Sequence, residues 1–274
     1  MSIGQICRFI GDSSVGFFGA GHLGRALAEA LLAGGLPRQN IAICHRGSGE
    51  TNRELAISGL TDLVTDKEEV VRRSRILLYL VRPQEYTAIR DCKLRDDCFL
   101  VSFLAGIPLE KLPVGLPYTQ RVRVMTSAPD TLRRQNGIAA LYPTDNVVTR
   151  ELLESLNLSI VPLMHESDIH AFTALGPCLP IVLTFLESLG NHIDYLELLE
   201  IAKKFELVDY LPILEWAHGV RPKGLSDVER ERYVAQATTP GGVTDAILSA
   251  LRIGRNISSA LEQGIERSRE LAAT

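Results

Sequence analysis

The sequence lacks several features that mark specialised classes of protein. It has little net charge, because 29 basic and 33 acidic side chains among 274 residues leave a formal charge of −4. Such a chain has no electrostatic footprint for nucleic acid or for an anionic membrane surface. Its five cysteines are odd in number and form no C-x-x-C pair, which disfavours both a disulfide framework and a zinc site. We expect reduced thiols in the cytoplasm and no bound metal; Cys178, with no base marked beside it, is predicted to be a buried structural thiol.

The chain also has little that resembles a targeting or membrane segment. Residues 1–14 carry one arginine and no long apolar stretch, unlike a signal peptide. The longest apolar run, 171–186, contains Pro177 and Pro180 and falls short of the ~20 residues that a membrane span needs. We therefore predict a buried helix there, in the core or at a subunit interface, and no membrane partner.

Two hydrophobic patterns divide the chain. In the first half, short apolar runs rich in β-formers alternate with helical stretches, which is typical of a mostly parallel sheet covered on both faces. The predicted strands are 15–18, 41–44, 76–80, 99–103, 122–125, 138–141 and 160–163. From residue 168 the period is helical, and helices are expected over 168–189, 194–216, 225–236, 242–252 and 256–271. The sequence predicts a doubly wound, Rossmann-type α/β domain, residues 1–165, followed by an all-α dimerisation domain, residues 166–274.

A glycine-rich turn follows the first predicted strand. Residues 15–18 run directly into Gly19-Ala20-Gly21-His22-Leu23-Gly24, and a helical stretch begins at Arg25. In this strand–G-x-G-x-x-G–helix context the first glycine permits a tight turn, the second lets the backbone approach a pyrophosphate, and the third lets helix pack on strand. The helix N-terminus attracts phosphate. The segment predicts a dinucleotide cofactor; the alternative is a glycine-rich turn of another α/β protein.

The end of the second predicted strand indicates which dinucleotide is bound. An Asp or Glu about twenty residues past the glycine turn would bind the ribose 2′-hydroxyl of NAD. Residues 44–48 read Cys-His-Arg-Gly-Ser and hold no carboxylate. Arg46, helped by Ser48 and His45, offers a cation and donors for the 2′-phosphate of NADP. We predict NADPH in preference to NADH; the alternative is a solvated polar loop.

Five further segments follow in order along the chain. They are Leu80-Val-Arg-Pro-Gln84, Ser102-Phe-Leu-Ala-Gly-Ile107, Arg121-Val-Arg-Val-Met125, Gly176-Pro177 and Gln236-Ala-Thr-Thr-Pro-Gly-Gly-Val-Thr244. Together with the glycine-rich turn they resemble the pyrroline-5-carboxylate reductase family over nearly the whole chain. The Thr-Pro-Gly-Gly-Val-Thr element is the most specific of these motifs.

The resemblance implies a homodimeric or larger NAD(P)H-dependent reductase whose helical domain intertwines with a second subunit. The implied reaction is hydride transfer to the C=N carbon of a cyclic imine carboxylate, giving proline. Carried over by position, residues 19–24 would hold the pyrophosphate, and Arg46 and Ser48 the adenosine phosphate. The nicotinamide side would be formed by Val81, Arg82, Pro83, Ala105 and Gly106. Contacts to cofactor or substrate from the partner chain would come from Gln236, Val243 and Thr244.

The chemistry of residues 239–244 agrees with that role. Thr239 is suited to cap a helix that begins at Pro240, and Gly241 and Gly242 leave N–H groups uncovered, which makes a nest for a carboxylate. Thr244 would then bond the ring nitrogen of the substrate. Because an iminium carbon is already electrophilic, the reaction needs positioning more than a strong acid. The alternative is a plain helix start.

Three segments depart from the family pattern. Thr126-Ser127-Ala128 replace a proline and an amide, Thr173-Ala174-Leu175 replace a small polar helix start, and Asp66 replaces an amide beside the ribose. A change in a pocket wall alters substrate discrimination by about 1–3 kcal/mol per methylene. The sequence therefore leaves open a pyrroline-5-carboxylate reductase, a reductase of a different imine or carbonyl, and a non-catalytic NADP-binding regulator.

Overall fold

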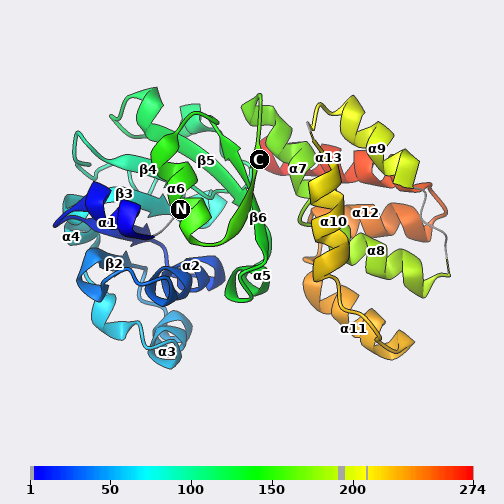
Figure 1. The fold of residues 1–274 in the computed structure, drawn as a ribbon, viewed down its shortest axis with the longest axis horizontal. Coiled ribbons are helices and arrows are strands. Elements are labelled where there is room, and N and C mark those ends of the chain that lie inside the picture. The colour runs from blue at the N-terminus through cyan, green and yellow to red at the C-terminus, as the bar shows by residue number, and fades with distance from the viewer. Residues whose placement is uncertain (1–2, 191–194, 208, 274) are drawn as a thin grey trace. The chain divides into compact units, whose positions relative to one another are not determined.

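The computed structural model describes residues 3–190, 195–207 and 209–273. These residues form two compact units, Met1–Pro162 and Leu163–Thr274 (Figure 1). The first residue of the helix predicted over 194–216, Asp194, lies outside the described part of the chain.

The first unit is built on one seven-stranded sheet with the order β2-β1-β3-β4-β5-β6-β7. The strands are β1 (Ser14–Phe18), β2 (Ile41–Cys44), β3 (Ser74–Tyr79), β4 (Phe99–Ser102), β5 (Arg121–Thr126), β6 (Gly137–Tyr142) and β7 (Leu158–Pro162). All neighbours pair in parallel except β5 and β6, which are antiparallel. The predicted fold class is confirmed, and each predicted strand has a counterpart. Because β1 lies between β2 and β3, the connections diverge there, and this switch point is where open α/β sheets bind ligands.

Apolar side chains cover both faces of this sheet. Val15 and Phe17 of β1 belong to one buried cluster, with side chains from α1 (Ile3–Ile10), α2 (His22–Ala33), α3 (Gly49–Ile57), α5 (Pro129–Arg133) and α6 (Val147–Ser155). Phe18 belongs to a second cluster with side chains from α4 (Lys67–Arg73), from β4, and from residues 89–98 and 104–116, which form turns and a short 3-10 helix. Successive residues of a strand point to opposite faces, so a strand covered on both sides is apolar throughout. This is why unbroken apolar runs marked the strands.

In the part of the second unit that the structure describes, the regular elements are all helices. Its helices are α7 (Ile169–Leu175), α8 (Leu179–Ser188), α9 (Tyr195–Lys204), α10 (Leu211–Val220), α11 (Asp227–Ala237), α12 (Val243–Arg252) and α13 (Ile257–Ala273). Helices α12 and α13 approach closely, since a Cβ on Gly264 would lie 2.4 Å from Cγ1 of Ile247. The predictions of single helices over 168–189 and 194–216 were wrong, because α7 ends before α8 and α9 ends before α10.

Both breaks precede a proline. Pro180 lies in the first turn of α8, and Pro212 in the first turn of α10. Proline is tolerated there because the first N–H groups of a helix have no partner within it, whereas in a helix interior it removes a hydrogen bond. Glu206 and Asp209 also have positive φ angles between α9 and α10.

The apolar stretch over residues 166–188 is long and apolar enough to cross a membrane by length and composition. In the structure, 72% of its most apolar window is buried within the protein. It packs as core helices do, as the interrupting prolines predicted.

Candidate dinucleotide site

A pocket of about 720 Å³ lies at the carboxyl ends of β1, β2 and β3. This is the edge of the sheet at the switch point, where the strand order favours ligand binding. The predicted cofactor residues that line it are Gly19, Ala20, Gly21, His45, Arg46, Ser48, Val81 and Arg82. Segments separated by up to sixty residues thus meet in one cavity.

The three motif glycines of the turn occupy three different environments. Gly19 has a φ of +121°, and a Cβ there would lie 2.6 Å from the carbonyl oxygen of Leu80. A Cβ on Gly24 would lie 2.6 Å from the carbonyl oxygen of Gly19. Gly21 faces open space, with no atom within 4 Å of its Cβ position. The backbone therefore requires glycine at positions 19 and 24, whereas Gly21 keeps the pocket wall uncovered.

The helix α2 begins at the edge of this pocket. Gly21 is its N-cap residue and provides no side-chain cap for the first N–H groups. Those groups have no partner within the helix, and the dipole adds partial positive charge, which suits a pyrophosphate. His22, Leu23 and Gly24 form the first turn of α2 and are not among the lining residues. These three residues form the start of the helix and do not line the pocket.

The loop after β2 presents Arg46 at the pocket rim. The Arg46 side chain is 67% exposed and forms an ion pair with Glu85. His45 Nδ1 accepts a hydrogen bond from the Gly47 N–H at 3.0 Å, and partial burial lowers the pKa of His45. A neutral ring with that acceptor carries its proton on Nε2, which makes His45 a donor. Ser48 caps α3, because its Oγ accepts the Thr51 N–H at 3.2 Å.

Three acidic residues on the pocket wall, Glu50, Glu68 and Glu85, were not predicted from the sequence. Glu50, Asp66, Glu68 and Glu85 all line the cavity, beside Lys67. Asp66 caps α4 by accepting the Glu69 N–H at 2.7 Å, which is the structural role of the carboxylate that replaces an amide in the family. The reason is topological: β3 pairs in parallel with β1, so Glu85 after β3 reaches the same edge as the glycine turn, and the bridge between Val64 and Ile43 of β2 brings residues 65–68 there.

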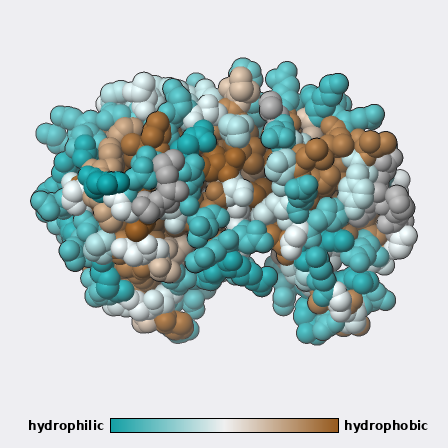
Figure 2. All heavy atoms as spheres, in the orientation of Figure 1, coloured by the Kyte–Doolittle hydropathy of each residue, from teal (hydrophilic) through white to brown (hydrophobic). Residues whose placement is uncertain are grey.

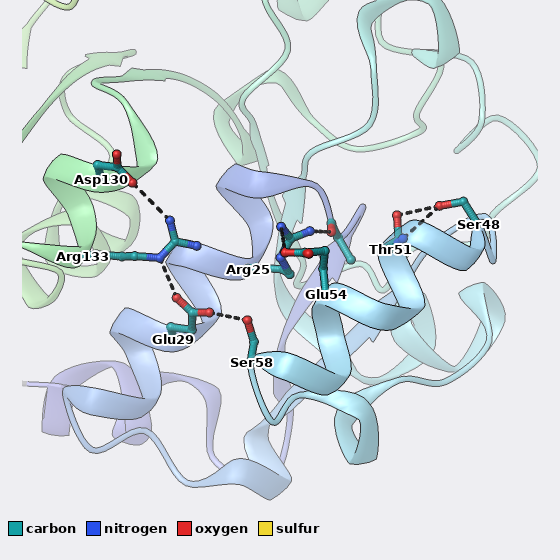
Figure 3. A network of polar contacts seen from close by, with 9 residues as sticks. Arg25, Glu29, Ser48, Thr51, Glu54, Ser58, Asp130 and Arg133 are labelled. Carbon is teal, nitrogen blue, oxygen red and sulfur yellow. Dashed lines mark hydrogen bonds and ion pairs between the residues drawn. The ribbon is translucent and has the colours of Figure 1, made fainter. Parts of the chain in front are cut away.

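A buried arginine, Arg25, lies between α2 and α3 beside Glu54 (Figure 3). Arg25 of α2 is 5% exposed, and its Nη1 donates to the carbonyl oxygen of Ala20 at 3.2 Å. Its Nη2 donates to Glu54 Oε2 of α3 at 3.1 Å. The side chain thus connects the turn to the helix that Ser48 caps. Sequence reasoning assigned Arg25 only to a helix; a cation immediately after the third glycine was the available signal.

Three predicted nicotinamide contacts lie outside the lining of this pocket. Pro83 begins a short 3-10 helix, η3 (Pro83–Glu85), directly after the lining residues Val81 and Arg82. Ala105 is exposed and Gly106 is buried with a φ of +76°, and both follow β4. They lie on the chain past the carboxyl end of a strand two places from β1.

The predicted substrate segment belongs to the helical unit and differs from the expected helix start. Thr239 does not cap a helix beginning at Pro240, because the chain turns between Thr239 and Gly242 and α12 begins at Val243. Gly241 has a φ of +71°, and its N–H donates to Asp245 Oδ2 at 2.9 Å. One donor of the predicted carboxylate nest is therefore bound to a carboxylate of the chain itself. Gln236 lies exposed on α11.

The Thr244 hydroxyl points into the helical unit. Thr244 is 9% exposed, and its Oγ1 donates to Cys178 Sγ at 3.2 Å. Burial raises the pKa of the Cys178 thiol to about 11, so this cysteine is the predicted structural thiol rather than a nucleophile. Leu175 is fully buried in the same unit, and its carbonyl oxygen accepts the Tyr210 hydroxyl at 2.9 Å.

Ser127, which replaces a family amide, has a structural role. It is 2% exposed, its Oγ accepts the Ile138 N–H at 3.0 Å, and it lies 2.7 Å from Thr131 Oγ1. The serine thus ties the end of β5 to β6. Ser127 therefore stabilises the chain where β5 ends, and its side chain does not face solvent.

Comparison with known proteins agrees with the geometry. A family model described as NADP oxidoreductase coenzyme F420-dependent matches residues 14–106. The pyrroline-5-carboxylate reductase of Pasteurella multocida is 24% identical and aligns over 94% of this chain and 97% of its own length. That of Pisum sativum is 26% identical over 98% of this chain and 100% of its own. The chain is thus similar to pyrroline-5-carboxylate reductases over nearly its whole length.

Solved structures of the family share the fold. The pyrroline-5-carboxylate reductase of Coxiella burnetii superposes with a TM-score of 0.59 at 20% identity, over 95% of this chain and 98% of that one. The Plasmodium falciparum pyrroline carboxylate reductase, solved with NADP bound, gives a TM-score of 0.56 at 18% identity, over 95% and 98%. The family's sheet and its C-terminal helical region are thus both present in this chain.

Proposed function

We propose that the protein is an NADPH-dependent reductase that acts on a cyclic imine carboxylate, with pyrroline-5-carboxylate as substrate and proline as product. The observation that carries the proposal is the uncovered Gly21 at the start of α2, over a pocket at the switch point. That arrangement is suited to a dinucleotide. The full-length similarity to pyrroline-5-carboxylate reductases supplies the reaction class.

NADPH, when bound, supplies the hydride, and the residues of this chain hold it in place. The α2 N-terminus would hold the pyrophosphate, and Arg46, with the Nε2–H of His45, would hold the 2′-phosphate. Ser48 acts through the start of α3, because its Oγ accepts the Thr51 N–H. Val81 and Arg82 also line the pocket, and we propose that they contact the nicotinamide together with Pro83, Ala105 and Gly106. The bound cofactor would supply a hydride for the C=N carbon, and with a proton on the nitrogen one NADPH and one proton would be consumed per product.

The helical unit is proposed to bind the substrate and to form a homodimer. Several large apolar side chains are exposed on it, including Leu196 at 70% and Ile253 at 75%. Apolar atoms interrupt its polar surface in the face drawn in Figure 2. In the proposal, Gly242, Val243 and Thr244 contact substrate, and Gln236 reaches the cofactor of the partner chain. We also place the protein in the cytoplasm, which the five free thiols support.

A second function, NADP binding without turnover or with another imine or carbonyl substrate, is favoured by one set of contacts. The Gly241 N–H is bonded to Asp245 and the Thr244 hydroxyl to Cys178. The Gly241 N–H must release Asp245 before it bonds a substrate carboxylate, and the Thr244 hydroxyl, while it donates to Cys178, can only accept a hydrogen bond from a substrate. The free energy lost with the hydrogen bond to Asp245 would weaken carboxylate binding at residues 241–242.

The two functions are separated by one assay. Purified protein is mixed with NADPH and racemic pyrroline-5-carboxylate, and absorbance of the reduced cofactor is followed. The reductase proposal predicts NADPH oxidation that depends on the imine. A confirmed NADPH complex with no rate above background would contradict the proline assignment and favour the second function.

A further inference from the structure

We infer that Glu85 helps to determine whether the site prefers NADPH or NADH, because its carboxylate is ion-paired with Arg46, the cation that is proposed to bind the 2′-phosphate. The inference rests on the proposed NADP site. Arg46 and Glu85 line the same pocket and form an ion pair. They come from different segments, 39 residues apart, one after β2 and the other after β3. A 2′-phosphate that reaches Arg46 has to share or displace this carboxylate.

The position of Glu85 is built into the fold. Its N–H donates to the carbonyl oxygen of Arg82 at 2.8 Å, closing η3. Its own carbonyl oxygen accepts the Tyr79 hydroxyl at 3.2 Å, and the same hydroxyl bonds Tyr86 at 2.9 Å. Tyr79 is fully buried in the sheet, so it anchors the η3 turn. The Glu85 side chain is 25% exposed, against 67% for Arg46. The carboxylate is therefore the better-fixed member of the pair.

The charge balance makes this placement selective. A phosphate dianion competes well for a guanidinium, but it meets repulsion from a fixed carboxylate beside it. A ribose with a free 2′-hydroxyl carries no charge at that position and donates to a carboxylate, which is the way acidic residues hold NAD. Glu85 thus lowers affinity for 2′-phosphorylated ligands and spares ligands without that phosphate. Glu85 therefore reduces the preference for NADPH over NADH that Arg46 provides.

The test measures binding of two adenosine ligands, adenosine 2′,5′-bisphosphate and adenosine 5′-monophosphate, by calorimetry. The Glu85→Gln variant keeps the side-chain shape and removes the charge. We expect it to bind the bisphosphate about 5- to 30-fold more tightly, from loss of one like charge at a partly exposed site, and to bind the monophosphate within about twofold of the original protein. Titration with NADPH and NADH repeats the comparison on whole cofactors.

Two controls make the result specific. Glu50→Gln neutralises another exposed carboxylate of the same pocket and is expected to have a smaller effect on bisphosphate affinity. In an Arg46→Ala background, Glu85→Gln is expected to have a smaller effect, because its competition with the phosphate for Arg46 is gone and only direct charge repulsion remains. Equal gains for the two Gln variants, equal gains for both ligands, or no gain from Glu85→Gln would overturn the inference. Failure of the original protein to bind either NADPH or the bisphosphate would instead overturn the proposed function.

Discussion

Substitutions at two glycines of one turn are predicted to have different effects: at Gly24 a loss of stability, and at Gly21 a loss of NADPH binding. Gly24→Ala places a Cβ 2.6 Å from the Gly19 carbonyl oxygen, a backbone atom that has little freedom to move. Overpacking of this kind costs about 1–3 kcal/mol. For a unit of this size, each kcal/mol lowers the melting temperature by about 2–4 °C, so the expected fall is about 2–12 °C.

Gly21→Ser adds its side chain in open space at the N-cap of α2. Serine is at least as good an N-cap residue as glycine, so the free energy of unfolding should stay within about 0.5 kcal/mol of the original value. The side chain covers the approach to the pyrophosphate. Loss of one hydrogen bond to a charged group, about 1.5–3 kcal/mol, predicts NADPH binding about 10- to 150-fold weaker.

Thermal unfolding followed by circular dichroism and titration of NADPH fluorescence separate these effects. Gly115→Ser is the matched control, because Gly115 is exposed, has open space at its Cβ position and lies outside the pocket lining. It should change neither quantity. A folded Gly21→Ser variant that binds NADPH normally would refute the assignment of the turn, and a Gly24→Ala variant of unchanged stability would refute the packing argument.

Three further predictions concern Arg46, Thr244 and Cys178. Arg46→Asp should weaken NADPH binding much more than NADH binding; equal losses in titrations of both cofactors would refute the role of Arg46. Thr244→Ala should lower turnover with little change in the NADPH dissociation constant, and should cost about 1 kcal/mol of stability because the bond to Cys178 is lost, while Thr244→Ser restores both. Full activity of Thr244→Ala would remove it from the reaction. Burial raises the pKa of Cys178 to about 11, so between about pH 9 and 11 the unfolded chain releases a proton that the folded chain keeps. The free energy of unfolding measured in urea should therefore fall as pH rises through that window, and it should fall less steeply in Cys178→Ala. Equal slopes of unfolding free energy against pH in the two proteins would contradict the raised pKa of Cys178.

The sheet followed from local sequence because its strands are apolar on both faces. Ile41–Cys44 and Phe99–Ser102, for example, begin and end within a residue of the predicted bounds. The long helical stretches were harder, since Pro180 and Pro212 have the same apolar neighbours whether they interrupt a helix or start one. Helical period records which face is buried and says little about where a helix restarts.

The candidate site also has features that local sequence predicts and features that depend on contacts between distant segments. The environments of Gly19, Gly21 and Gly24 depend on a short loop, and their spacing was enough to predict them. The pairing of Arg46 with Glu85 depends on β3 lying next to β1, which one sequence does not reveal. The inward direction of the Thr244 hydroxyl follows from a helix that starts at Val243 rather than at Pro240.

Hydride transfer from NADPH to an imine carbon is tested most directly with labelled cofactor. NADPH carrying deuterium at the transferable position is incubated with pyrroline-5-carboxylate and the protein, and the product is analysed by mass spectrometry. We predict proline with one deuterium at the former imine carbon, formed in step with NADPH loss. Unlabelled product, or no proline while NADPH is demonstrably bound, would contradict the account.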